Sequence, residues 1–199
     1  MANVNVGFGL KPISMLGGAP ATQGTNSYHI ASNASAIFQG SPVIATNSGT
    51  IAVSSSASGD TLKFVGVFAG CEYVSSSTGK KVFSNFWPGS GADTNFDILG
   101  FVHDNPFQRF VVCSDASLTD KATAITTIFE GAEFSAESNK GAADGSTTTG
   151  LSAAQLDVST VDASDLSHPL KIVGILDDPD NEDFTAAGIP LIVVINNHA

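Results

Sequence analysis

The chain has 199 residues, and 8 Lys or Arg stand against 19 Asp or Glu, which gives a formal net charge of -11 at pH 7. A protein this acidic repels phosphate backbones and anionic membrane surfaces, so we expect neither a nucleic-acid nor a membrane partner. Hydrophobic residues make up 42% of the chain, which is enough for one core and excludes disorder throughout.

Residues 1–32 are predicted to form an extended N-terminal arm. Apolar residues stand there at irregular intervals among Gly and Pro, with neither a helical nor a strand period. Such an arm cannot bury its own side chains, so we expect it to lie over its own domain or over a neighbouring subunit. A disordered terminus is the alternative. The candidate partner-contact residues of the arm are Phe8, Leu10, Ile13, Met15 and Leu16.

Residues 33–199 are predicted to form one mainly β domain with little helix. Short runs rich in β-branched and aromatic residues alternate with Gly, Pro and Asn turns, which is typical of antiparallel strands. Turns at 47–49 and 75–80 predict two hairpins, and Gly66 and Gly70 predict a bulge or a close backbone approach. An antiparallel β-barrel and a β-sandwich both satisfy the pattern. The expected strands are 36–39, 42–45, 50–53, 63–73, 81–89, 96–103, 107–113, 156–161, 170–176 and 190–195.

Three segments place Gly inside an apolar run, at 64–68, 98–102 and 172–176, and predict similar strands in one sheet system. Between them, residues 116–150 form a candidate inserted segment. Residues 118–128 are expected to be helical, and 139–150 to be an exposed, mobile polar loop. The weight of Phe in the composition, 13 residues, favours core filling.

The cysteines and the N-terminus carry no redox, metal or targeting motif. Cys71 and Cys113 have no CxxC spacing, so two buried free thiols are favoured over a disulfide. The first residues lack the features of a signal peptide, and no apolar stretch approaches the ~18 residues of a membrane span. We therefore expect synthesis in a cytoplasm.

Residues 177–183 form the densest run of charge in the chain. Asp178, Asp180 and Glu182 have the alternate spacing of an EF-hand loop, but Asp183 stands where that loop needs Gly, and Ile189 where it needs Glu. A solvated acidic turn, with Asp180 or Asn181 as an N-cap and a short helix near 184–187, is favoured over a calcium site.

No recognised catalytic pattern involves the four histidines, which are His29, His103, His168 and His198. No phosphate-binding loop or nucleophile elbow occurs either. We expect no enzymatic activity, no cofactor and no bound metal. Trp87 precedes Pro88 and Gly89, so core or corner packing is favoured for it. Its alternative role is an anchor for a partner.

Several short motifs together resemble small structural proteins of tailed bacteriophages, especially those of marine and cyanobacterial hosts. These motifs are Gly40-Ser-Pro-Val, Gly49-Thr-Ile, Val65-Gly-Val-Phe-Ala-Gly, Phe83-Ser-Asn-Phe-Trp-Pro-Gly and Asn196-Asn-His198. The resemblance spans most of the chain and is to capsid decoration, or cement, proteins. It implies a virion location on the capsid surface, the major capsid protein as partner, and a homo-oligomer, a trimer or dimer. No catalytic residues come with it.

One segment departs from the resemblance, because residues 116–150 have no counterpart among the smaller decoration proteins. They are either an inserted outer subdomain or the mark of a tail or head-fibre component. In the second case the 139–150 loop would recognise a glycan or receptor. A small hydrolase is a third class, and it would need histidines and carboxylates gathered in one cleft.

Overall fold

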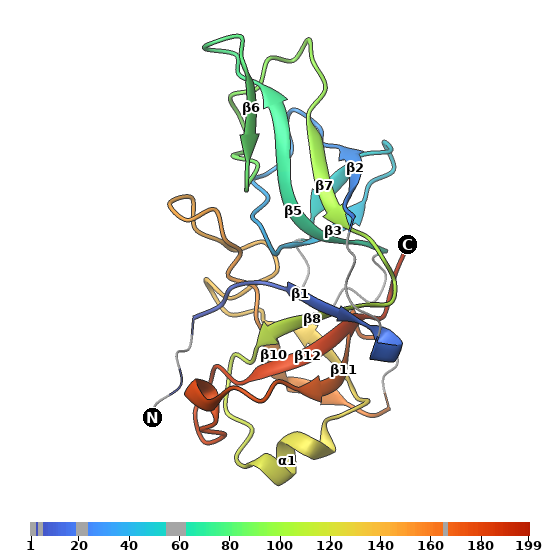
Figure 1. Ribbon diagram of the computed structural model, residues 1–199, viewed down its shortest axis with the longest axis vertical. Coiled ribbons are helices and arrows are strands. Elements are labelled where there is room, and N and C mark those ends of the chain that lie inside the picture. The colour runs from blue at the N-terminus through green and yellow to red at the C-terminus, as the bar shows by residue number, and fades with distance from the viewer. Residues whose placement is uncertain (1–2, 4–5, 19–23, 55–62, 165–166) are drawn as a thin grey trace.

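The computed structural model describes residues 3, 6–18, 24–54, 63–164 and 167–199. Strands make up 42% of the residues and helices 6%, which confirms a mainly β chain with little helix. The described strands form two antiparallel sheets, which lie one above the other in Figure 1 and are called here the upper and the lower sheet. No helix among the described residues is long and apolar enough to cross a membrane.

The upper sheet contains the two predicted hairpins. Its strand order is β2-β7-β5-β3-β4, and β6 pairs with the far part of the long strand β5. The turn at 47–49 joins β3 to β4, and the turn at 75–80 joins β5 to β6, so both hairpin predictions are confirmed. The bounds are β2 Asn26–His29, β3 Pro42–Ala45, β4 Ile51–Val53, β5 Phe64–Val74, β6 Lys81–Ser84 and β7 Leu99–His103.

The two glycines inside β5 mark breaks in its pairing. The register with β3 shifts next to Gly66, and the register with β7 shifts next to Gly70. A Cβ on Gly66 would lie 2.1 Å from the His103 carbonyl oxygen, and the φ of Gly66 is 155°. Only glycine permits this approach, so the prediction of a bulge or close contact is confirmed.

The lower sheet has the order β1-β8-β12-β11-β9-β10. Consecutive strands β7 and β8 belong to different sheets, so the turn at 104–107 carries the chain from one to the other. The Gly-containing segments divide between the two sheets, with β5 and β7 in the upper sheet and β11 in the lower. The bounds are β1 Lys11–Met15, β8 Gln108–Cys113, β9 Gly131–Phe134, β10 Leu156–Asp162, β11 Leu170–Ile175 and β12 Pro190–Ile195.

Among the described residues, isolated bridges link segments near opposite sides of each sheet. Ile30 bridges Ile51 of β4, and Ser114 bridges Leu156 of β10. Among the described residues neither sheet closes as a barrel, and the two antiparallel sheets agree with the sandwich alternative.

Each sheet has a hydrophobic core, and β5 links the two. Phe64, at the start of β5, belongs to the core of the lower sheet, where its ring lies 5.9 Å from that of Phe134. Phe68, four residues later, belongs to the core of the upper sheet. The expectation that Phe fills the core holds only in part, because four Phe side chains are more than half exposed. These are Phe83 at 69%, Phe96 at 56%, Phe107 at 61% and Phe129 at 70%.

The N-terminal segment supplies an edge strand to each sheet. Strand β1 pairs with β8 of the lower sheet, and β2 pairs with β7 of the upper sheet. The arm was expected to lie over its own domain or over a neighbouring subunit, and in the structure it lies over its own domain. The sequence pattern did not indicate strands here; β1 pairs with a register shift between Pro12 and Met15, whereas β2 pairs with β7 without a shift. Residues 1–2, 4–5 and 19–23 of the predicted arm lie outside the described residues.

Residues 116–150 are not a separate outer insertion. They contain the predicted helix, α1 at Lys121–Thr126, which is capped by the Asp120 side chain accepting a bond from the Thr123 amide. They also contain β9, which lies between β11 and β10 in the lower sheet. A segment that supplies an internal strand is part of the fold.

Candidate functional site

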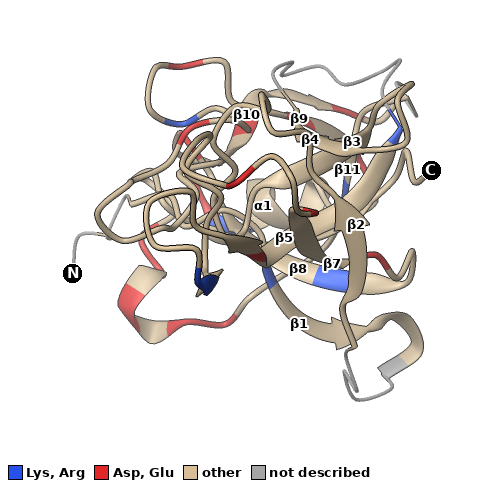
Figure 2. Ribbon diagram, turned by 90° about the horizontal axis from the view of Figure 1, so that it is seen from above, with Lys and Arg blue, Asp and Glu red and all other residues tan. Residues whose placement is uncertain are grey.

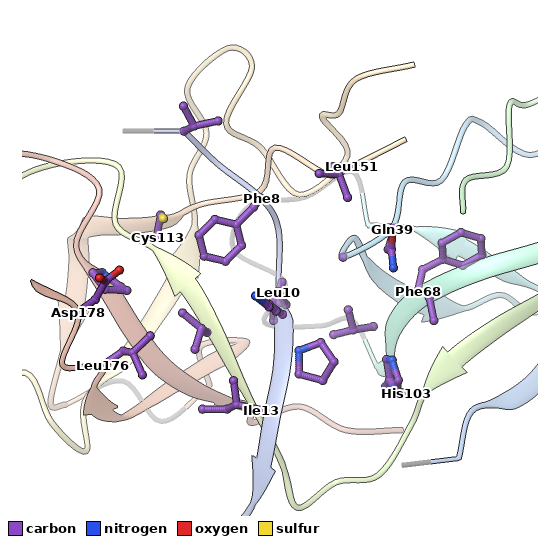
Figure 3. Close-up of a pocket in the computed structure, with 18 of the residues that line it drawn as sticks. Phe8, Leu10, Ile13, Gln39, Phe68, His103, Cys113, Leu151, Leu176 and Asp178 are labelled. Carbon is purple, nitrogen blue, oxygen red and sulfur yellow. The ribbon is translucent and has the colours of Figure 1, made fainter. Parts of the chain in front are cut away.

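An apolar cleft of about 670 Å³ lies where the two sheets meet. Figure 3 shows its walls: Cys113, Leu176 and Asp178 come from the lower sheet and its loops, and Gln39, Phe68 and His103 come from the upper sheet. The arm runs between the walls. Its contribution to the lining is Val6, Phe8, Leu10, Lys11, Pro12 and Ile13.

Backbone contacts hold the arm in this position. The Leu10 amide donates to the Gly40 carbonyl oxygen at 2.9 Å, just before β1 begins. A Cβ on Gly9 would lie 2.5 Å from the same oxygen, and the φ of Gly9 is 73°, so the approach requires glycine. The Leu10 side chain is 1% exposed and belongs to the lower core. The arm is therefore anchored at Leu10.

The rim of the cleft exposes apolar side chains to solvent. Val6 is 63% exposed, Leu151 41% and Leu176 36%. These three come from segments far apart in the chain, and the fold gathers them around one opening. Contiguous apolar surface around a concave site is typical of a surface that another molecule covers.

The polar groups of the cleft are not arranged for nucleophilic chemistry. Burial raises the pKa of the Cys113 thiol to about 12, so the thiol is protonated at neutral pH. Desolvation lowers the pKa of His103 and favours its neutral form. Figure 3 shows these two side chains on opposite walls. Cys113 and His103 therefore do not form a nucleophile and base pair in this cleft.

The six predicted contact residues divide into three groups. Phe8, Leu10 and Ile13 line the cleft together. Met15 lines a second, smaller pocket of about 240 Å³, and Leu16 donates its amide to the Phe107 carbonyl oxygen at 2.8 Å. Trp87 stands apart from both groups, in the upper core.

Trp87 has no surface for a partner. Its side chain is 0% exposed, its indole Nε1 donates to the Ala34 carbonyl oxygen at 3.2 Å, and its ring centroid lies 5.4 Å from that of Tyr73 in a T-shaped arrangement. The core-packing interpretation is confirmed. The alternative role as a partner anchor would require the upper core to open.

The acidic turn at 177–183 is ordered by Asp178. This carboxylate accepts bonds from the Asp180 amide at 3.1 Å and from Asn181 Nδ2 at 2.8 Å, and it caps the 3-10 turn Pro179–Asn181. The expected cap at Asp180 or Asn181 was therefore wrong, because Asp178 caps the turn. The short helix expected near 184–187 does not occur. Among the described residues, no three His, Cys, Asp or Glu side chains gather as a metal site.

Three of the histidines have different polar neighbours. His29 is 3.7 Å from Asp97, His168 is 3.5 Å from Glu133, and His198 Nε2 is 2.8 Å from the Asp104 carbonyl oxygen. Both cysteines are buried free thiols, which confirms that expectation.

The 139–150 loop is pinned at its base. The Gln39 amide donates to the Gly150 carbonyl oxygen at 2.9 Å, and Asn85 Nδ2 donates to the Thr149 carbonyl oxygen at 2.9 Å. A Cβ on Gly145 would lie 2.3 Å from the Phe38 ring, so the loop backbone packs on that ring. Residues 145–149 are exposed, as expected, but the loop as a whole does not project as a free tip.

Sequence reasoning missed all three residues of the rim, Val6, Leu151 and Leu176. Leu151 follows a polar loop and Leu176 follows the apolar strand β11, and neither position carries a signal that separates it from core residues. The distribution of charge does not mark the position of the cleft either. Figure 2 shows Asp and Glu spread over turns and loops, with the few Lys and Arg scattered among them.

No family model, curated protein or solved structure matches the chain.

Proposed function

We propose that this chain is a virion structural protein of a tailed bacteriophage, which binds the outside of the assembled capsid and stabilises contacts between major capsid protein subunits. The observation that carries the proposal is the apolar cleft with its exposed rim, Val6, Leu151 and Leu176. Such a surface favours a lasting protein neighbour, because apolar area gains free energy only when water is removed from it.

The net charge and the composition of the loops support a binding role on the outside of the capsid, away from the packaged DNA. The net charge of -11 disfavours contact with packaged DNA. Uncharged polar loops, rich in Ser, Thr, Asn and Gly, lose less hydration on lateral packing than loops rich in Lys and Glu. The short motifs from Gly40 to His198 add the resemblance to phage cement proteins.

A cement protein acts by adding interface to each capsid contact. Shell expansion under internal pressure must then break these contacts before subunits separate. Each interface contributes only the surplus over its association costs, but the contribution repeats with the symmetry of the shell. We expect tighter binding to mature than to immature shells, because the composite site forms during maturation.

Co-sedimentation with purified shells tests this function. The wild-type chain should sediment with mature shells, and Leu176→Glu should lose at least tenfold in affinity, because it places a charge at the cleft rim. Ser77→Glu adds the same charge in an exposed turn outside the cleft and should bind like the wild type. A wild-type chain that stays in the supernatant with mature shells would overturn the proposal.

Copy number in the virion gives an independent test. Quantitative mass spectrometry of purified virions should find this chain at a ratio near one to the major capsid protein. A handful of copies per particle would contradict a shell-wide cement and would favour the tail or head-fibre alternative.

A further inference from the structure

A polar hollow of about 350 Å³ lies where the edge strands of the upper sheet, β2 and β4, approach each other. Three segments that are far apart in the sequence form it: the end of β2, the turn between β3 and β4, and the loop before β7. Figure 1 shows β2 and β7 side by side in this sheet. The hollow and the cleft have no lining residue in common, so they are separate places on the molecule.

Backbone bonds fix the three segments relative to one another. The Ile30 amide donates to the Ile98 carbonyl oxygen at 2.9 Å, and Ile30 bridges Ile51 of β4. The Thr46 amide donates to the Thr50 carbonyl oxygen at 2.8 Å, which closes the turn. Ile30 and Ile98 line the hollow and belong to the upper core. The hollow is therefore preformed, and a ligand has little chain to order when it binds.

An exposed aromatic ring lines the hollow. Phe96 is 56% exposed, and its amide donates to the Asp93 carbonyl oxygen at 3.2 Å. The Asp93 carboxylate accepts bonds from the Asn95 amide at 3.0 Å and from Asn95 Nδ2 at 2.8 Å. These bonds order the loop that carries the ring. The ring offers a flat apolar surface to a ligand in the hollow.

Polar side chains with unused hydrogen-bonding capacity surround the ring. His29 Nδ1 lies 3.7 Å from Asp97 Oδ1, and both side chains are exposed. The hydroxyls of Ser32, Ser48 and Thr94 also line the hollow, and they have no hydrogen-bond partner among the described residues. Each hydroxyl can donate or accept a bond, and the carboxylate accepts. The hollow therefore combines one apolar surface with several polar groups.

This composition argues against several classes of ligand. No Lys or Arg lines the hollow, and the Asp97 carboxylate together with the net charge of -11 disfavours an anion. One carboxylate is too few for a calcium ion, which takes several oxygen ligands. A wholly apolar ligand would leave the polar groups without partners. An uncharged ligand with an apolar face and hydroxyls at its edge fits best, and a sugar ring has this form.

We propose that the hollow binds a sugar ring of an uncharged glycan, with the Phe96 ring against the C–H face of the sugar and the Asp97 carboxylate accepting bonds from its hydroxyls. The imidazole of His29 and the three hydroxyls supply further bonds around the ring. A volume of about 350 Å³ is at the lower end of the range of small-molecule sites, which limits the contact to one or two sugar rings. The inference goes beyond the proposed function and does not depend on it.

One such contact is weak, because few groups touch the ligand and association itself costs free energy. We expect a dissociation constant in the millimolar range for a single sugar ring. Copies repeated on a capsid would bind many glycan ends at once, and the particle would gain affinity by avidity. Only this last consequence rests on the proposed function.

The first test is an NMR titration of the full chain labelled with ¹⁵N. The probes are the methyl glycosides of glucose, galactose, mannose, rhamnose, fucose and N-acetylglucosamine. At least one should shift the amide signals of residues 29–32, 48–50 and 94–98 in a saturable way. The amides of Gln39 and Val111, which line the cleft, should not move. The proposal is overturned if none of the six shifts the signals of the hollow at tens of millimolar.

The second test compares variants with the sugar that binds. Phe96→Ala should bind about tenfold more weakly, because the contacts of an aromatic ring are worth roughly this factor. Asp97→Asn keeps the size of the side chain but removes its charge, and it should also bind more weakly. Phe83→Ala removes a ring on β6 that is 69% exposed and lies outside the hollow, so it should bind like the wild type.

Urea midpoints separate loss of binding from loss of folding. Phe96 is exposed and Asp97 holds no backbone bond, so both variants should unfold close to the wild-type midpoint. A Phe96→Ala variant that binds the sugar as tightly as the wild type would contradict the proposal, because the ring would then not be part of the site.

Shell binding separates this proposal from the proposed function. Phe96→Ala should sediment with mature shells like the wild type, because its ring lies outside the cleft. A chain that sediments with shells but shifts with no sugar would leave the cement function standing and overturn the glycan site. A chain that binds a sugar in the hollow but no shells would do the reverse.

Discussion

The clearest consequence of the anchored arm is the effect of Leu10→Ala. Leu10 is 1% exposed and packs in the lower core, whereas Leu16, in the same arm, is 38% exposed. Truncating a buried leucine costs about 2–5 kcal/mol. Because Leu10 also lines a cleft that water can enter, we expect the lower part of that range, about 2–3 kcal/mol. Leu16→Ala, the matched control, should cost less than about 1 kcal/mol.

Urea unfolding measures this difference. Trp87 is the only tryptophan and is fully buried in the upper core, so its fluorescence reports unfolding there, and circular dichroism reports the strands of both sheets. With a slope of about 2 kcal/mol/M, Leu10→Ala should lower the midpoint by roughly 1 M. If Leu10→Ala costs no more than Leu16→Ala, the arm is dispensable for folding, and our account of it is wrong. The same reasoning predicts that deletion of residues 1–20 destabilises the domain.

Three further predictions concern backbone space and titration. Gly66→Ala should lower the free energy of unfolding by about 3 kcal/mol or more, because the new Cβ meets a backbone oxygen at 2.1 Å. Gly79→Ala, with open space around it, should lower it by about 1 kcal/mol. Urea midpoints compare the two variants. Burial raises the pKa of both cysteine thiols to about 12, so iodoacetamide at pH 8 should label Cys71 and Cys113 only after unfolding, and rapid labelling of the native chain would contradict their burial. A hydrogen bond to the Asp104 carboxylate raises the pKa of Tyr28 to about 12, so the stabilising contribution of this bond is present below pH 10 and is lost as the pH rises towards 12. Tyr28→Phe should therefore lose less stability than the wild type over that interval. Equal losses would count against the bond.

The strands of the domain were largely predictable because their signals are local. Apolar β-branched runs ending in Gly, Pro or Asn identify β3 to β5, β7, β8 and β10 to β12, and the two hairpins follow from turns of a few residues. Gly66 and Gly70 stood out because glycine inside an apolar strand is unfavourable unless the backbone needs it.

The arm and the loop could not be predicted because their partners are distant in sequence. Lys11 pairs with Val111, and Gln39 bonds to Gly150, contacts that no local periodicity encodes. The candidate site was predicted in part for the same reason. The apolar residues of the arm indicated Phe8 and Ile13, but the opposite walls of the cleft exist only once both sheets have formed.

The pairing of the first strand with one so much later in the chain sets an order of events during synthesis. Val111 follows Lys11 by 100 residues, and a ribosome adds about 5–20 residues per second, so β1 waits roughly 5–20 s for its partner. All strands of the upper sheet lie between residues 26 and 103, and they are therefore made before β8 is complete. The upper sheet can form while the chain is still growing, and the cleft is finished only after the nascent arm finds the lower sheet.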